Sequence, residues 1–151
     1  MTAAHANGGE WLARAEAALT AAGRKRGLAR RALLELLASQ RCALTAVQIE
    51  SELRGASARP VSRASIYRIL DELERLGLVA RVETGQAMVR FERAHDHEGH
   101  HHHLVCDACG VVMPFTDPLL ERAITSLSER VPLAVSEHEI VLHGACRDCA
   151  P

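Results

Sequence analysis

Four of the five cysteines occur in two Cys-x-x-Cys pairs that are separated by 36 residues. Each pair can reach around one side of a small cation, and four thiolates complete the tetrahedral shell that zinc prefers. Two disulfides are the alternative, but a reducing compartment favours zinc for paired cysteines. Because the pairs lie far apart, a folded domain must bring them together. The predicted structural zinc ligands are Cys106, Cys109, Cys146 and Cys149.

Four consecutive histidines precede the first cysteine pair, and they need another role because the cysteines already fill one metal site. Alternate side chains of an extended strand face opposite sides, so the run supplies two imidazoles to each of two sites. The first pair faces the C-terminal part of the chain. Three imidazoles and one carboxylate there suit zinc or ferrous iron. These predicted ligands are His100, His102, Glu121 and His138.

The second pair of imidazoles, His101 and His103, faces the segment 92–99, which has no periodicity and is interpreted as a linker. A metal bound across a linker favours one relative orientation of the flanking domains by its differential affinity. Its ligands must be deprotonated, so the effect weakens in acid. The residues that compete to complete this site are Glu92, His95, Asp96 and His97.

The first half of the chain has the pattern of a DNA-binding domain. Helices followed by a β-hairpin form a winged helix-turn-helix, in which the last helix reads the DNA. This recognition helix, Ile66 to Leu76, offers Arg63, Tyr67 and Arg68 beside its apolar seam. The helices are predicted over residues 10–22, 28–39, 45–53 and 63–76, and the strands over 78–82 and 88–91.

The net charge of −1 conceals a division between the two parts. Residues 1–93 carry 15 Lys and Arg against 10 Asp and Glu, whereas residues 94–151 carry 3 against 9. A basic part beside an acidic, ligand-rich part indicates a polyanion binder joined to a cation binder. The alternative for the first part is a helical bundle with a solvated basic face, but the hairpin favours nucleic acid.

The last third predicts a small α+β module with strands at 104–106, 111–115 and 138–143. Asp117 and Pro118 open a helix whose apolar residues are expected to face inward. A small sheet with an exposed edge tends to pair with a copy of itself, so a homodimer is expected. The predicted organisation is a winged-helix DNA-binding domain at 1–91, a hinge at 92–99 and a metal-binding dimerisation domain at 100–151.

The chain begins without a basic segment followed by an apolar run, so no signal peptide is predicted. No apolar run approaches the roughly 18 residues that a membrane span requires. The expectation is a cytoplasmic protein with no membrane partner.

Several motifs together resemble the ferric uptake regulator (Fur) superfamily over nearly the full length of the chain. This resemblance implies a dimeric, metal-activated transcriptional repressor that binds palindromic operator DNA and is not an enzyme. The matching segments are Ala-Ser-Ile-Tyr-Arg-Ile-Leu at 64–70, Leu-Gly-Leu-Val at 76–79, Arg-Phe-Glu at 90–92, the histidine and cysteine run at 100–110, and the final Cys-x-x-Cys.

The resemblance also assigns roles to single residues. It implies that Glu92, His101 and His103 belong to a regulatory hinge site and that Lys25 and Arg30 contact DNA. The four cysteines match its structural zinc site, His100, His102, Glu121 and His138 its dimerisation-domain site, and Tyr67 and Arg68 its recognition helix. A hinge histidine that is common in the family is replaced by Ala43, so Cys42, His95, Asp96 or His97 is the fourth ligand.

The histidine run lacks the aspartate that iron-sensing members carry, so it resembles the zinc-sensing (Zur) branch more. The sequence therefore predicts zinc as the regulatory ion ahead of ferrous iron, with nickel, manganese and peroxide sensing behind. Two other classes of function remain as alternatives. One is a zinc hydrolase that uses His100, His102 and Glu121, although it lacks an open ligand position and an obvious general base. The other is a metal-buffering protein without DNA affinity.

Overall fold

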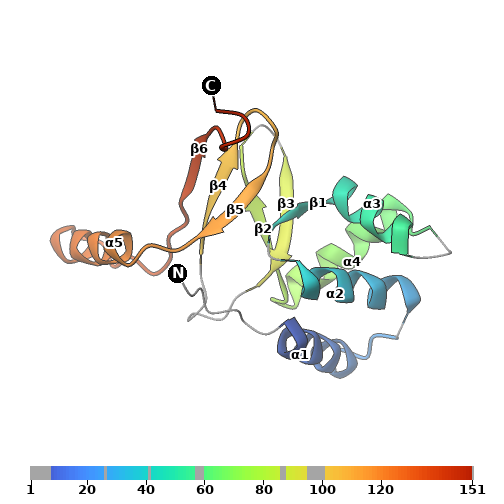
Figure 1. Cartoon of the computed structure of the whole chain (residues 1–151). Helices are drawn as coiled ribbons and strands as arrows, with labels where there is room; N and C mark the ends of the chain where they lie inside the picture. Colours follow the sequence, from blue (N-terminus) through green and yellow to red (C-terminus); the bar gives the residue numbers. More distant parts are fainter. Residues whose placement is uncertain are drawn as a thin grey trace. The chain divides into compact units, whose positions relative to one another are not determined.

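The computed structural model of the 151-residue chain describes residues 8–25, 27–40, 42–56, 60–85, 88–94 and 101–150. The chain divides into two compact units, residues 1–99 and 100–151 (Figure 1). Among the described helices none has both the length and the apolar character to cross a membrane. Four of the predicted metal ligands, His95, Asp96, His97 and His100, lie outside the described residues.

The described part of the first unit contains four helices, and side-chain caps begin two of them. Helix α3 begins with a reciprocal capping box, because Thr45 Oγ1 accepts from Gln48 N while Gln48 Oε1 accepts from Thr45 N. Ser62 caps α4 by accepting from Ser65 N. The helices are α1 (Gly8–Ala21), α2 (Leu28–Ser39), α3 (Ala46–Ala56) and α4 (Arg63–Arg75).

A three-stranded antiparallel sheet completes this unit, in the order β1-β3-β2. Strands β2 (Val79–Glu83) and β3 (Val89–Arg93) form the predicted hairpin. Strand β1 (Leu44–Thr45) was not predicted, because two residues are too short to show a periodic pattern. It exists through its pairing with β3, where Leu44 lies opposite Phe91. Helices followed by this hairpin form the winged-helix arrangement.

One hydrophobic core holds the helices and the hairpin of the first unit together. Trp11 joins α1 to the start of the hairpin, since its Nε1 donates to the Leu78 carbonyl oxygen at 2.9 Å. The apolar seam of α4 faces this core, which leaves the other side of the helix exposed. The largest fully buried side chains of this core are Leu33, Leu37, Ile49, Ile66, Leu70, Leu73 and Phe91.

The second unit contains a three-stranded sheet with β4 (His102–Cys106) at its centre. Strand β5 (Val112–Phe115) pairs with β4 in antiparallel fashion, and β6 (Val141–Gly144) pairs with it in parallel. The strand predicted over 138–143 is shorter and later than expected, because His138 to Ile140 precede β6 as irregular chain. The two units together give the α+β fold that the sequence predicts.

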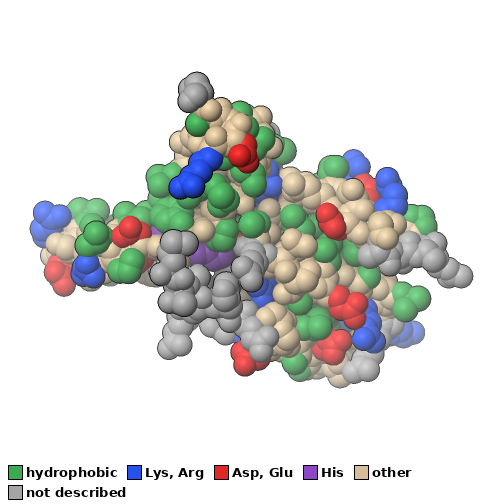
Figure 2. All heavy atoms as spheres, viewed as in Figure 1, with side chains coloured by type: hydrophobic (Ala, Val, Ile, Leu, Met, Phe, Trp, Pro, Cys, Tyr) green, Lys and Arg blue, Asp and Glu red, His purple; other side chains and the backbone are tan. Residues whose placement is uncertain are grey.

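Helix α5 (Pro118–Arg130) connects β5 to the segment before β6. Its start follows the prediction, since Asp117 Oδ1 accepts from the Leu119 and Leu120 amides. The prediction that its apolar residues face inward is wrong for this chain, because none of its residues is buried. Figure 1 shows α5 extending away from the sheet of its own unit, and Leu119 and Leu127 are 68% and 50% exposed. Hydrophobic side chains are accordingly visible along its surface in Figure 2.

Candidate metal centres and nucleic-acid surface

The parallel pairing of β4 and β6 brings the two distant cysteine pairs together. Parallel strands end at the same edge of a sheet, and Cys106 lies opposite Gly144 in the register. The Asp107 amide donates to the Gly144 carbonyl oxygen at 2.8 Å and joins the two turns that follow these strands. The single ligand atoms of Cys106, Cys109, Cys146 and Cys149 all lie within 4.8 Å of one another.

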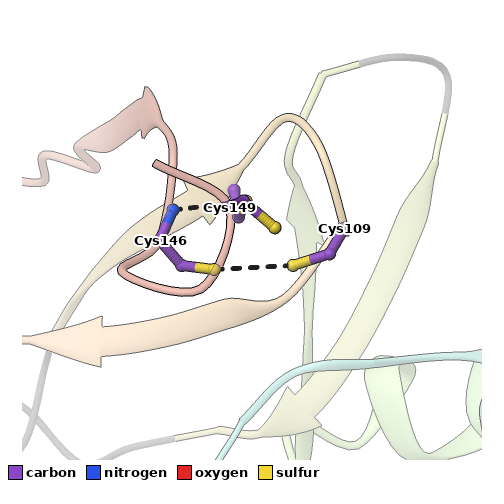
Figure 3. A group of neighbouring side chains, drawn as sticks. Cys109, Cys146 and Cys149 are labelled. Carbon is purple, nitrogen blue, oxygen red and sulfur yellow. Dashed lines mark hydrogen bonds between the residues drawn. The ribbon is translucent and has the colours of Figure 1, made fainter. Parts of the chain in front are cut away.

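The thiol positions fit the geometry of a tetrahedral zinc site. A zinc–sulfur bond of about 2.3 Å places neighbouring sulfurs of a tetrahedron about 3.8 Å apart. The Sγ atoms of Cys109 and Cys146 face each other at 3.8 Å, from the β4–β5 turn and from the turn after β6 (Figure 3). All five cysteines are free thiols, which excludes disulfides among them in this structure.

Backbone amides in both turns stabilise the arrangement. In the first turn Gly110 N donates to the Cys106 carbonyl oxygen at 2.8 Å, and Gly110 has a φ of 73°, which favours glycine. In the second turn the amides of Cys149 and Ala150 donate to the Cys146 carbonyl oxygen. Each turn therefore presents its two sulfurs on one side.

The four thiols differ in how readily they ionise. The pKa of Cys106 is lowered to about 6, mainly by hydrogen bonds to its sulfur from the backbone amides of Cys146 and Cys109. The pKa of Cys149 is raised to about 12, because its thiol hydrogen-bonds to Cys146 and Cys109. Thiolates packed this closely repel one another, so the cluster needs a cation before all four can be ionised.

A second group of possible ligands lies at the start of β4. His102 is fully buried, and its Nε2 lies 2.8 Å from Glu121 Oε1. His138 Nε2 lies 3.1 Å from the other carboxylate oxygen, Glu121 Oε2. Strand β4, helix α5 and the segment before β6 each contribute one of these side chains. The three donor atoms converge within 4.8 Å, and the fourth predicted ligand, His100, lies outside the described residues.

The predicted hinge ligands are divided between the two units. His101 and His103 belong to the second unit, where their rings pack edge to face with centroids 4.8 Å apart. Glu92 lies on β3 of the first unit. The alternation of side chains along β4 is as expected, because His102 contacts Glu121 while His103 is grouped with His101. Cys42 lies just before β1 and is partly buried.

Three of the five predicted DNA-contacting residues, Arg63, Tyr67 and Arg68, are exposed on α4. Tyr67 is 44% exposed and its ring contacts the edge of Phe91, with centroids 6.3 Å apart. Arg68 is exposed, and its Nη2 donates to Ser65 Oγ at 3.0 Å. A tyrosine and an arginine on the outer side of a recognition helix can reach base edges and phosphates.

The structure adds two glutamates that the sequence analysis did not single out. Glu50 on α3 accepts from Arg63 at 2.7 Å and from Arg54 at 3.1 Å. Glu72 on α4 accepts from Arg30 and Arg24, both at 2.6 Å. Only the Glu50–Arg54 pair, spaced four residues apart on one helix, left a signal in the sequence.

Comparisons with known proteins agree with this architecture. Residues 21–143 match the Ferric uptake regulator family. A ferric uptake regulation protein of Vibrio anguillarum is 32% identical over 134 residues, which are 87% of each chain. Another from Bordetella parapertussis is 31% identical over 113 residues, 66% of this chain and 78% of the relative.

Solved structures with a similar fold cover most of the chain. The Vibrio cholerae ferric uptake regulator is 30% identical with a TM-score of 0.76, over 87% of this chain and 98% of that one. The Helicobacter pylori ferric uptake regulator has a TM-score of 0.82 at 24% identity, over 99% and 97%. A zinc uptake regulator bound to zinc and DNA has a TM-score of 0.57 at 25% identity, over 93% of both chains. By its sequence match over most of its length, this chain belongs to the ferric uptake regulator family.

Proposed function

We propose that this chain is a homodimeric, metal-responsive repressor that binds palindromic operator DNA and is activated by ferrous iron. The proposal rests on the presence, in one chain, of two features. One unit has an exposed recognition helix, and the other has converging metal ligands. Membership of the family makes the chain a DNA-binding transcription regulator, so the hydrolase alternative is set aside.

Iron replaces zinc as the proposed regulatory ion. The curated relatives described above are named ferric uptake regulation proteins, whereas the zinc uptake regulator is a structural neighbour. The preference for zinc drawn from the histidine run is therefore not confirmed. Two imidazoles and a carboxylate, the donors of His102, His138 and Glu121, accept ferrous iron as well as zinc.

The four-cysteine cluster is proposed as a structural zinc site. Its sulfur spacing fits zinc, and the ion would join the turn after β4 to the turn after β6. Zinc would stabilise the folded state there and would have no catalytic role.

The regulatory step is proposed to use the hinge ligands Glu92, His101 and His103. Because Glu92 belongs to the first unit and both histidines to the second, a metal bound by all three would favour one orientation of the units. In a dimer this orientation sets the spacing of two recognition helices, which must match half-sites about one helical turn apart. Cys42, His95, Asp96 and His97 remain candidates for the fourth ligand.

Domain limits of 1–91, 92–99 and 100–151 and a cytoplasmic location belong to the same proposal. Strand β3 extends to Arg93, two residues beyond the first limit, and the last domain begins with the histidine run.

The test is anaerobic operator binding with controlled free metal. Operators are first selected from random duplexes with ferrous iron present, and binding is then measured by fluorescence anisotropy. We expect removal of the labile metal to weaken binding by about 5- to 150-fold, the usual range of allosteric coupling. His101→Ala should abolish the response to iron and keep the structural zinc. His143→Ala is the matched control, since this exposed histidine pairs with Asp107.

Two results would contradict the proposal. Equal binding after the labile metal is stripped would remove the regulatory claim. A response to zinc at free concentrations where iron has no effect would restore zinc as the regulatory ion.

A further inference from the structure

Glu72 is a charged residue buried within the first unit, with only 9% of its surface exposed. It lies on α4, one turn beyond Arg68. Its two carboxylate oxygens are used separately: Oε1 accepts from Arg24 Nε and Oε2 from Arg30 Nη2, each at 2.6 Å. Arg24 lies in the connection between α1 and α2, and Arg30 lies in the first turn of α2. One buried carboxylate therefore ties this connection to the recognition helix.

Arg30 extends the link to the residue expected to contact DNA. Its Nη1 donates to the backbone carbonyl oxygen of Lys25 while its Nη2 binds Glu72. Its Nε is shielded from solvent. Two of the five N–H groups of Arg30 are thus bonded within the unit, its Nε is covered, and only 22% of its side chain is exposed, so this guanidinium is directed to Glu72 and the Lys25 carbonyl rather than to a phosphate. The resemblance to the family had implied a direct DNA contact for Arg30.

Lys25 differs from Arg30 in each of these respects. Its side chain is exposed, and it makes no ion pair with any residue that the structure describes. The ammonium group is therefore available to a phosphate, while its backbone is held by Arg30.

The ion pairs of the buried Glu72 carboxylate are costly to break, because removal of one partner leaves the other charge uncompensated.

We propose that Glu72 is a positioning residue for DNA binding, which holds Lys25 and the recognition helix in one arrangement, and that Arg30 acts through Glu72. This inference rests on the proposed DNA-binding function. It predicts that loss of the Glu72 charge changes DNA affinity in the direction opposite to the one that simple electrostatics predicts. Loss of a negative charge near a polyanion should strengthen binding. Loss of a positioning carboxylate should weaken it.

The experiment measures operator affinity over a series of salt concentrations with the full-length, metal-loaded protein. Each lost phosphate contact lowers the slope of log K against log salt by about 0.9. We expect Glu72→Gln to weaken binding about tenfold, a usual cost for one such interaction, and to lower the slope by about 0.9, as Lys25→Gln does. Glu52→Gln, which removes an equal charge from an exposed position on α3, should bind at least as tightly as the wild type.

The double variant Glu72→Gln/Arg30→Gln separates the two roles of Arg30. If Arg30 acts through Glu72, the double variant has the same slope as Glu72→Gln alone. A further fall of about 0.9 would mean that Arg30 contacts a phosphate itself and would overturn its assigned role. A merely destabilised domain would lower the active fraction and the melting temperature without changing the slope.

Arg30→Lys keeps the argument testable if Glu72→Gln does not fold. It preserves the charge but cannot bind Glu72 and the Lys25 carbonyl together, so we expect the same loss of slope. An unchanged slope and affinity in the folded variants would overturn the inference while the wild type still binds DNA. Failure of the wild type to bind any operator would instead overturn the proposed function, and this inference with it.

Discussion

At the scale of single residues, the four cysteines are chemically unequal although they form one cluster. Cys106 is the thiol that ionises most readily, because the Cys146 and Cys109 amides donate to its sulfur and hold its pKa near 6. Cys149, in contrast, has a pKa raised to about 12 by thiol hydrogen bonds to its neighbours. Cys106 is therefore the first thiolate available to an incoming cation.

This inequality predicts how zinc retention depends on pH. The lowered pKa keeps Cys106 as a thiolate above about pH 6, and protonation removes that thiolate as the pH falls through this value. Zinc affinity should therefore decrease between pH 7.5 and pH 5, as measured by competition with a chromophoric chelator. Cys106→Ser should lose the zinc at both values, whereas Cys42→Ser, which alters the cysteine outside the cluster, should retain it. Equal affinity at both pH values would disprove this account.

At the scale of elements, α5 is amphipathic, yet none of its residues is buried. Its apolar residues Leu119 and Leu127 are exposed, and a surface of this kind usually marks an interface. Homodimerisation is the proposed reason for its composition. The start of this helix was nevertheless predictable from local sequence, because Asp117 caps it and Pro118 begins it.

Leu127→Asp should weaken dimerisation without unfolding the protein. Leu127 is half exposed in the single chain, so a charge there costs little until a partner covers it. We expect a loss of about 2 kcal/mol or more, typical of an interface anchor, which is about 30-fold in the dissociation constant. Sedimentation equilibrium measures the change, with Ser126→Asp at the adjacent exposed position as control. An unchanged dimer would show that α5 lies outside the interface.

At the scale of the whole molecule, the two units are stabilised by different means. The residues of the main hydrophobic core fall between positions 11 and 91 of the sequence, so this core lies entirely within the first unit. In the second unit the buried hydrophobic residues among those described are Val105, Cys106 and Val112. A unit of this size with so small a core depends on a metal or on association.

Removal of the structural zinc should therefore unfold one unit and leave the other intact. Zinc sites of this kind supply about 10–16 kcal/mol in zinc-finger peptides, far more than three buried side chains. With a strong chelator, calorimetry should lose the transition of the second unit, while the Trp11 fluorescence change that reports the first unit persists. If the chelator abolished both transitions, the first unit would depend on the metal-bound second one.

Much of the fold was accessible from the sequence because its signals are local. The helix starts at Thr45, Ser62 and Asp117 depend on side chains that bond amides two or three residues away, and the structure contains all three caps. The cysteine spacing identified a four-thiol cluster for the same reason, since each Cys-x-x-Cys turn closes on itself.

Tertiary structure decided which of these local elements meet, and how. No local pattern predicts that β6 pairs in parallel with β4, yet the register of this pairing brings Cys146 beside Cys109. The Glu72 ion pairs join residues 42 and 48 positions apart. Such contacts depend on the packing of whole elements. The partner of a charged residue that is distant in sequence therefore cannot be identified from the local sequence. The sequence by itself determined the ligand types and the helix ends; the long-range contacts determined their arrangement in space.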